Sequence, residues 1–473
     1  MLQELLAREA ELSSQMRALE ESLAGVRVRI AEMREINRNA VTYNLPSEIL
    51  SAIFEARKSA IFEAKKYETS NTTRRRRVSI FGQRKPQPPF ELLVSAVSRR
   101  WRNVALQTPR LWTDLNIHVL KQMHELHILY LNRSKMCLLD ITLTQSNFPW
   151  ECDDHQDLDH STCFKWYLEL LIPHVARWKK LVIQNALVGS ISTAFSALTD
   201  LYAPALETLV ATLATDQGQR QVMEVFSRGA PRLSSMELGV CLRPPQGVPV
   251  KHLKLNFQLS HTEFSQFIRP MSSLTQLSMC DNILTDTNHS TIELPSVTSL
   301  DLRLSGIVNF RSLDFPAVET FTIYGYCREA IEALSQSHRL YPAVTSFTIE
   351  CEYSIEGQYV PAGMIPDFIS LLPHVREVTF QGADPIPIFQ VLRDQQQTDK
   401  LLWSHLSAIT VKLSKNVKVS YKKELWTHIV HVVQNRIRLG TPISRITLPL
   451  QIIERGSKKQ YRWLKEQVAL VEC

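Results

Sequence analysis

The sequence lacks any apolar run long enough to cross a membrane, and its first 36 residues are charged and periodic rather than built like a signal peptide. Its eight cysteines are scattered, and no two of them form a Cys-x-x-Cys pair. We therefore expect a protein of the cytoplasm or nucleus that meets no membrane and whose thiols stay reduced.

Glycine is also scarce: the 473 residues include only 14, and neither a phosphate-binding glycine loop nor a nucleophile elbow occurs. The net charge is +7, and much of it lies in one short run, so no general nucleic-acid-binding face is predicted. No spacing of Ser, His and Asp points to catalysis. We expect a protein that is not an enzyme, needs no cofactor and binds no specific nucleic acid.

One cluster has the chemistry of a metal site. Cys152, His155, His160 and Cys163 offer two sulfurs and two imidazoles, a set that suits tetrahedral zinc. The central gap of the cluster is short for a zinc finger, and the aspartates around it suit a solvated loop. We therefore predict no metal site.

Residues 1–38 carry apolar side chains at a seven-residue interval. Leu5, Leu12, Leu19, Val26 and Met33 form one row. The second row holds Leu2, Met16, Leu23 and Ile30, and only Glu9 interrupts it. This pattern predicts a coiled-coil helix. Its narrow seam needs a partner, which is either a second copy of the chain or the chain's own surface.

Residues 44–114 predict two short amphipathic helices joined by a polar loop. Pro46 suits a first helical turn, and four apolar residues follow it in one stripe: Ile49, Leu50, Ile53 and Phe54. A second stripe includes Leu93, Val97 and Trp101. Periodicity alone would also fit an ordinary buried helical hairpin.

The order of three motifs in this segment resembles the F-box-like family, in its fungal branch. The motifs are Leu45-Pro46-Ser47-Glu48-Ile49-Leu50-Ser51-Ala52-Ile53-Phe54, Val97-Ser98-Arg99-Arg100-Trp101-Arg102 and Pro109-Arg110-Leu111-Trp112. Ser98 stands where the family usually has Cys, and the segment between the helices is longer than usual. The resemblance implies docking on a Skp-type adaptor through Leu45, Pro46, Ile49, Leu50, Ile53, Phe54, Val97 and Trp101. Trp101 is expected chiefly to pack the helices together.

Residues 57–89 form the insertion, which is basic and proline-containing. Lys58, the run Arg74-Arg75-Arg76-Arg77 and several prolines predict an exposed, disordered loop. The bland interpretation is a solvated loop that aids solubility. The four arginines also suit a nuclear-import receptor. A third interpretation is regulation, since Arg76-Arg77-Val78-Ser79 resembles a basophilic kinase substrate, with Ser79 as the phosphosite.

Residues 115–473 continue a pattern that begins at Trp112: a large apolar residue, two others, a large apolar residue, one other and a third large apolar residue. The repeats begin at Trp112, Leu138, Trp178, Leu233, Val250, Leu274, Val297, Val318, Val344, Val375, Leu406 and Ile443. The pattern predicts short strands with one buried face, and its irregular spacing resembles degenerate leucine-rich repeats. Segments 223–227, 264–268, 328–335, 368–372 and 425–438 have helical patterns.

The expected fold is α/β, with an N-terminal coiled-coil helix and an F-box-like helical domain followed by an irregular leucine-rich-repeat solenoid, or horseshoe. A compact α/β domain with a parallel sheet would fit the same alternation, although so many strands are uncomfortable in one twisted sheet. The concave face of a solenoid would expose short polar residues and, as candidate substrate contacts, Asp301, Arg303, Tyr324 and Glu350.

The sequence thus leaves two functional hypotheses. In the first, the chain is the substrate-recognition subunit of a Skp/cullin/F-box-type ubiquitin ligase; its partners are the Skp-type adaptor, the cullin scaffold and an unknown protein substrate. In the second, it is a structural or nuclear scaffold that self-associates as a homodimer through its coiled coil.

Overall fold

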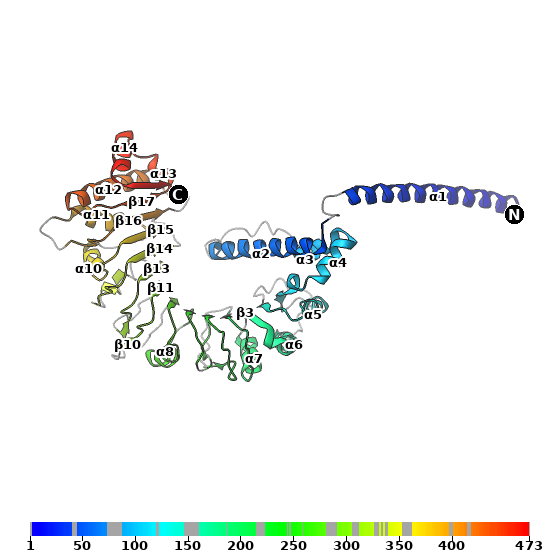
Figure 1. Cartoon of the computed structure of the whole chain (residues 1–473), viewed down its shortest axis with the longest axis horizontal. Coiled ribbons are helices and arrows are strands. Elements are labelled where there is room, and N and C mark those ends of the chain that lie inside the picture. The colour runs from blue at the N-terminus through cyan, green and yellow to red at the C-terminus, as the bar shows by residue number, and fades with distance from the viewer. Residues whose placement is uncertain are drawn as a thin grey trace. The chain divides into compact units, whose positions relative to one another are not determined.

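The computed structural model describes residues 2–39, 45–72, 88–119, 123–145, 160–186, 188–213, 223–243, 245, 247–257, 259–280, 291–304, 312–325, 331–332, 334–335, 339–351, 362–396, 401–413 and 418–472. These residues form an α/β protein with a long N-terminal helix and a large parallel sheet (Figure 1). The chain divides into two units. Unit 1 is Met1–Thr113 with Tyr130–Lys135, and unit 2 is Asp114–Leu129 with Met136–Cys473.

Unit 1 is helical. Its elements are α1 (Leu2–Asn39), α2 (Ser47–Thr72), α3 (Phe90–Val97), α4 (Arg99–Gln107) and the 3-10 helix η2 (Pro109–Trp112), and the end of α5 (His124–Arg133) joins them. A helix was expected over residues 1–38, and α1 is that helix. By contrast, α2 continues to Thr72, although a disordered loop was expected from residue 57 onward.

Within the described residues, the main sheet of unit 2 has 14 strands, and their order across the sheet is their order in the chain. The strands are β1 (Asp114–His118), β2 (Leu139–Thr144), β3 (Trp178–Ala186), β4 (Thr208–Leu213), β6 (Ser235–Leu238), β8 (His252–Leu255), β9 (Gln276–Cys280), β11 (Ser299–Leu304), β13 (Thr320–Gly325), β14 (Ser346–Glu350), β15 (Glu377–Gln381), β16 (Ala408–Lys412), β17 (Arg445–Leu448) and β18 (Ala469–Glu472). Every pairing between them is parallel.

Two small parallel pairs accompany the main sheet: β5 (Met223–Glu224) with β7 (Leu242–Arg243), and β10 (Ile292–Glu293) with β12 (Leu313–Asp314). The helical prediction at residues 223–227 was therefore wrong: Met223 and Glu224 form a strand, and no helix follows at residues 225–227. The helices of unit 2, besides the start of α5, are α6 (His160–Leu171), α7 (Val188–Leu198), α8 (His261–Ile268), α10 (Ile365–Ser370), α11 (Ile386–Asp394), α12 (Val419–Arg438), α13 (Leu450–Ile453) and α14 (Lys458–Gln467), with the 3-10 helices η4 (Ile172–Arg177) and η6 (Ala362–Met364).

The apolar repeat builds the core of unit 2. Its second member occupies the same register position on each strand, so these side chains form one continuous buried row: Leu115, Ile141, Leu181, Leu209, Met236, Leu253, Leu277, Leu300, Phe321, Phe347, Val378, Ile409 and Ile446. The third member forms a second buried row from Ile117 to Val411. Helices pack on this face: Phe347 contacts Phe368 of α10 at 5.5 Å between ring centroids, and Phe380 contacts Phe389 of α11 at 5.4 Å.

Cysteines give one correction. Cys137, Cys163 and Cys241 are in no disulfide, as expected, but Cys351 is disulfide-bonded, so the expectation that all thiols are reduced was wrong. Burial raises the pKa of the Cys241 thiol to about 11, which keeps that group protonated at neutral pH.

Candidate protein-binding surfaces

The helices of unit 1 close around Phe54. Its ring lies 5.1 Å from that of Trp101 on α4 and 6.5 Å from that of Phe90 on α3, centroid to centroid. Phe54 and Leu50 are each only 1% exposed. These two residues were expected to touch an adaptor, but their burial places them in the core of the unit. They hold α2 against its neighbours instead of offering a contact surface.

The other half of the same stripe is exposed. Ile49 and Ile53 on α2 are 49% and 48% exposed, and Pro46 precedes them on the surface. On α3, Val97 is 61% exposed and Leu93, which was not proposed as a contact, is 46% exposed. We call these five residues the apolar patch of unit 1. Leu45 and Trp101 are half-buried, so they are less exposed than the patch and more exposed than the core.

Ser98 has a clear structural task. It is the N-cap of α4, and its hydroxyl accepts a hydrogen bond from the backbone N–H of Trp101 at 3.2 Å. The guanidinium of Arg100 donates to the carbonyl of Leu45, and the indole of Trp112 donates to the carbonyl of Ala105 at 2.9 Å. The first two motifs that carry the family resemblance are therefore joined by a hydrogen bond, and the third is bonded to α4 through Ala105.

A buried polar cluster ties α2, α3 and α5 together. Tyr130 donates to the Glu91 carboxylate at 2.6 Å, and the ammonium of Lys58 lies 3.9 Å from the same carboxylate and also donates to the carbonyl of Leu111. The side chains of Lys58 and Glu91 are only 13% and 7% exposed. Lys58 was expected in an exposed basic loop; this was wrong, because α2 continues through it and directs it inward.

The second surface is the face of the main sheet opposite the apolar rows. Asp301 and Arg303 of β11, Tyr324 of β13 and Glu350 of β14 come from three neighbouring strands, as the alternation predicted. Arg303, Tyr324 and Glu350 share one register row, which continues to Gln381 and Lys412. The structure thus brings the four candidate substrate contacts onto one polar face.

Charges on this face are partly buried and partly paired. Burial raises the pKa of the Asp301 carboxyl, while a hydrogen bond from Thr322 lowers it and the nearby Glu350 raises it further. Gln381 donates to Glu350 at 2.6 Å, and Lys254 pairs with Glu237 at 2.6 Å. These contacts fix the carboxylates in place, so a partner would meet a preorganised polar surface.

A row of threonines adjoins these charges. The single residue between the second and third apolar members is threonine on five consecutive strands, β13 to β17: Thr322, Thr348, Thr379, Thr410 and Thr447. None of these threonines is among the candidate contacts named from the sequence. The signal for them was the repeat itself, because equal repeat positions fall on equal register positions in a parallel sheet.

Several predicted features lie outside the described residues: the run Arg74 to Arg77, Ser79, Cys152 and His155. His160 begins α6, and its side chain is outside the described part as well. Cys163 is half-buried and is in no disulfide. No group of three or more His, Cys, Asp or Glu suited to a metal ion occurs among the residues that the structure describes. The described helices include none that is both long and apolar enough to span a bilayer.

Comparison with known proteins adds no family to these observations. The chain matches no protein-family model and no curated protein sequence. The two surfaces must therefore be interpreted from their own chemistry.

Proposed function

We propose that the chain is the substrate-recognition subunit of a Skp/cullin/F-box-type ubiquitin ligase. The observation that carries this proposal is the apolar patch of unit 1: Ile49 and Ile53 on α2 are exposed, as is Pro46 just before the helix, and the buried Leu50 and Phe54 lie next to them in sequence. Two further exposed apolar residues lie on α3. Exposed apolar side chains on a rigid helical element are what a protein partner buries.

Unit 2 supports the substrate-binding part of the proposal. We infer that its sheet is a solenoid of leucine-rich-repeat type, because its parallel strands follow one another in chain order and each adds the same apolar and polar register positions. The polar face with Asp301, Arg303, Tyr324 and Glu350 would then hold a protein substrate. The chain would act by proximity, raising the concentration of substrate lysines near the transferase, with no bond-making step of its own.

The test is binding of the full chain to a purified Skp-type adaptor. The informative variant is the double substitution Ile49→Gln/Ile53→Gln, which removes apolar surface while keeping helix propensity. A matched control is Met136→Gln, because Met136 is 84% exposed and belongs to unit 2. We expect the double variant to bind at least about tenfold more weakly and the control to bind like the wild type. Absence of binding by the wild-type chain would overturn the proposal.

A scaffold function is the second candidate, and the exposed apolar seam of α1 favours it. It differs from the first in needing no adaptor, so the same binding measurement separates the two.

A further inference from the structure

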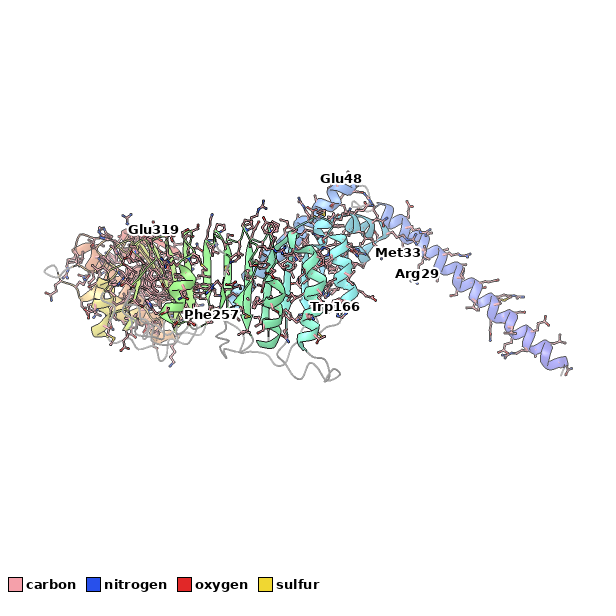
Figure 2. The ribbon with its side chains drawn as sticks, turned by 90° about the horizontal axis from the view of Figure 1, so that it is seen from below. Arg29, Met33, Glu48, Trp166, Phe257 and Glu319 are labelled. Carbon is pink, nitrogen blue, oxygen red and sulfur yellow. The ribbon has the colours of Figure 1, made fainter. Side chains whose placement is uncertain are left out.

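The helix α1 leaves the apolar side chains of its seam exposed. The described seam side chains are between 46% and 69% exposed: Leu12, Met16, Leu19, Leu23, Val26, Ile30 and Met33. Figure 2 shows side chains projecting all around this helix, among them Arg29 and Met33. At 38 residues the helix is about 57 Å long, enough for five heptads. Such a seam is stable in water only when a second helix covers it.

We propose that α1 pairs with α1 of a second copy of this chain, and that the two helices run antiparallel. The first reason is the charge along the helix. Residues 2–21 hold five glutamates and two arginines, whereas residues 22–39 hold four arginines and two glutamates. An antiparallel pair sets the acidic half of each helix against the basic half of the other, and the two-fold symmetry provides this attraction twice.

The second reason is the penalty on a parallel pair. In that arrangement Glu9, at a seam position, faces Glu9 of the second copy and buries two like charges. Arg29 and Arg34 then occupy the flanking positions that meet across the interface, and symmetry produces this repulsion twice. Both terms oppose parallel pairing.

Antiparallel pairing removes these conflicts without losing seam contacts. Seam residues whose numbers add to 35 then face each other, for example Leu12 with Leu23 and Met16 with Leu19. Glu9 faces Val26 of the second copy, beside that copy's Arg27. Arg8 and Arg29 come near each other at the flank, but Arg8 is already paired with Glu11 at 2.9 Å, which weakens their repulsion.

Orientation is tested by cross-linking the full chain through single added cysteines, Leu12→Cys and Leu23→Cys, on differently tagged copies with a short bismaleimide linker. The wild-type chain controls for its own eight cysteines, and the linked peptides are identified by mass spectrometry. In the antiparallel pair positions 12 and 23 are opposite, whereas in a parallel pair they are about 16 Å apart along the axis. We expect the mixture to link these positions at least about tenfold more than either variant alone links to itself.

Self-linking of Leu12→Cys alone would overturn the orientation, and failure of every inter-chain link would overturn the pairing in favour of folding back on the same chain. Sedimentation of Met16→Glu/Leu19→Glu gives the second measurement, with a monomer expected. Gly25→Ala is the matched control, since an added Cβ there meets nothing within 4 Å and the position is off the seam; it should stay dimeric. The inference does not depend on adaptor binding, because the seam variants leave the apolar patch of unit 1 intact.

Discussion

Removing the Glu91 carboxylate tests whether the buried polar cluster organises unit 1. In Glu91→Leu, Lys58 loses its carboxylate partner at 3.9 Å and Tyr130 loses an acceptor at 2.6 Å, both inside the unit. Truncating one partner of a buried ion pair costs about 3–5 kcal/mol. Lys58 keeps its bond to the Leu111 carbonyl, which is worth about 1 kcal/mol. We therefore expect a loss of about 2–4 kcal/mol.

The assay is hydrogen exchange of the α2, α3 and α4 amides in the full chain, where such a loss appears as about 30- to 1,000-fold faster exchange. Glu48→Gln is the matched control, since Glu48 is exposed in the first turn of α2 and its change should leave exchange nearly unaltered. The double variant Lys58→Met/Glu91→Leu should recover most of the loss, because it removes both charges together. If Glu91→Leu exchanges like the wild type, or if the double variant is worse than the single one, the reasoning is refuted.

Three further predictions concern individual side chains. Phe54→Ala should cost about 3–5 kcal/mol in urea denaturation of unit 1, whereas Ile53→Ala, at a half-exposed neighbour, should cost less than about 1 kcal/mol; equal costs would contradict the assigned core. Arg436 is fully buried and donates to the carbonyls of Leu402 at 2.7 Å and Trp403 at 3.1 Å. Arg436→Ala should therefore lower the thermal midpoint and cost about 3 kcal/mol of stability. An unchanged melting curve would contradict this prediction. Burial lowers the pKa of His127 below its ordinary value of 6.5. As the pH falls, His127 therefore binds a proton in the unfolded chain at a pH where it is still neutral in the folded chain. The free energy of unfolding should fall as pH drops below 6.5, by at most about 1.4 kcal/mol per pH unit, and His127→Asn should fall less steeply.

The strands of unit 2 were largely predictable from the sequence. All twelve repeats that begin with a large apolar residue became strands of the main sheet. Two described strands of the main sheet were missed, as were the four short strands of the two small pairs. β4 has Ala211 at its third apolar position, which is too small for the pattern. β18 has no apolar triplet, and its pairing with β17 at the edge of the sheet makes it a strand.

The helical unit shows where periodicity stops being informative. The sequence places Ile49, Leu50, Ile53 and Phe54 on one stripe, and all four were candidate contacts. Packing divides the stripe: Leu50 and Phe54 are buried, with the Phe54 ring against those of Phe90 and Trp101, whereas Ile49 and Ile53 are exposed. A stripe about 100° wide can hold both core residues and exposed contact residues. The pattern alone therefore cannot tell which residue packs in the core and which stays on the surface.

The composition and apolar spacing of this chain determined that α1 is a long helix with a seam, that a helical segment follows, and that strands with one buried face fill the rest. These are local properties, since each depends on the side-chain period of its own element. Tertiary structure alone decided that Lys58 turns inward to Glu91, 33 positions away in the sequence, and that Leu50 and Phe54 are buried while Ile49 and Ile53 are exposed. Partner choice across long sequence separations depends on packing and register, which no local pattern encodes.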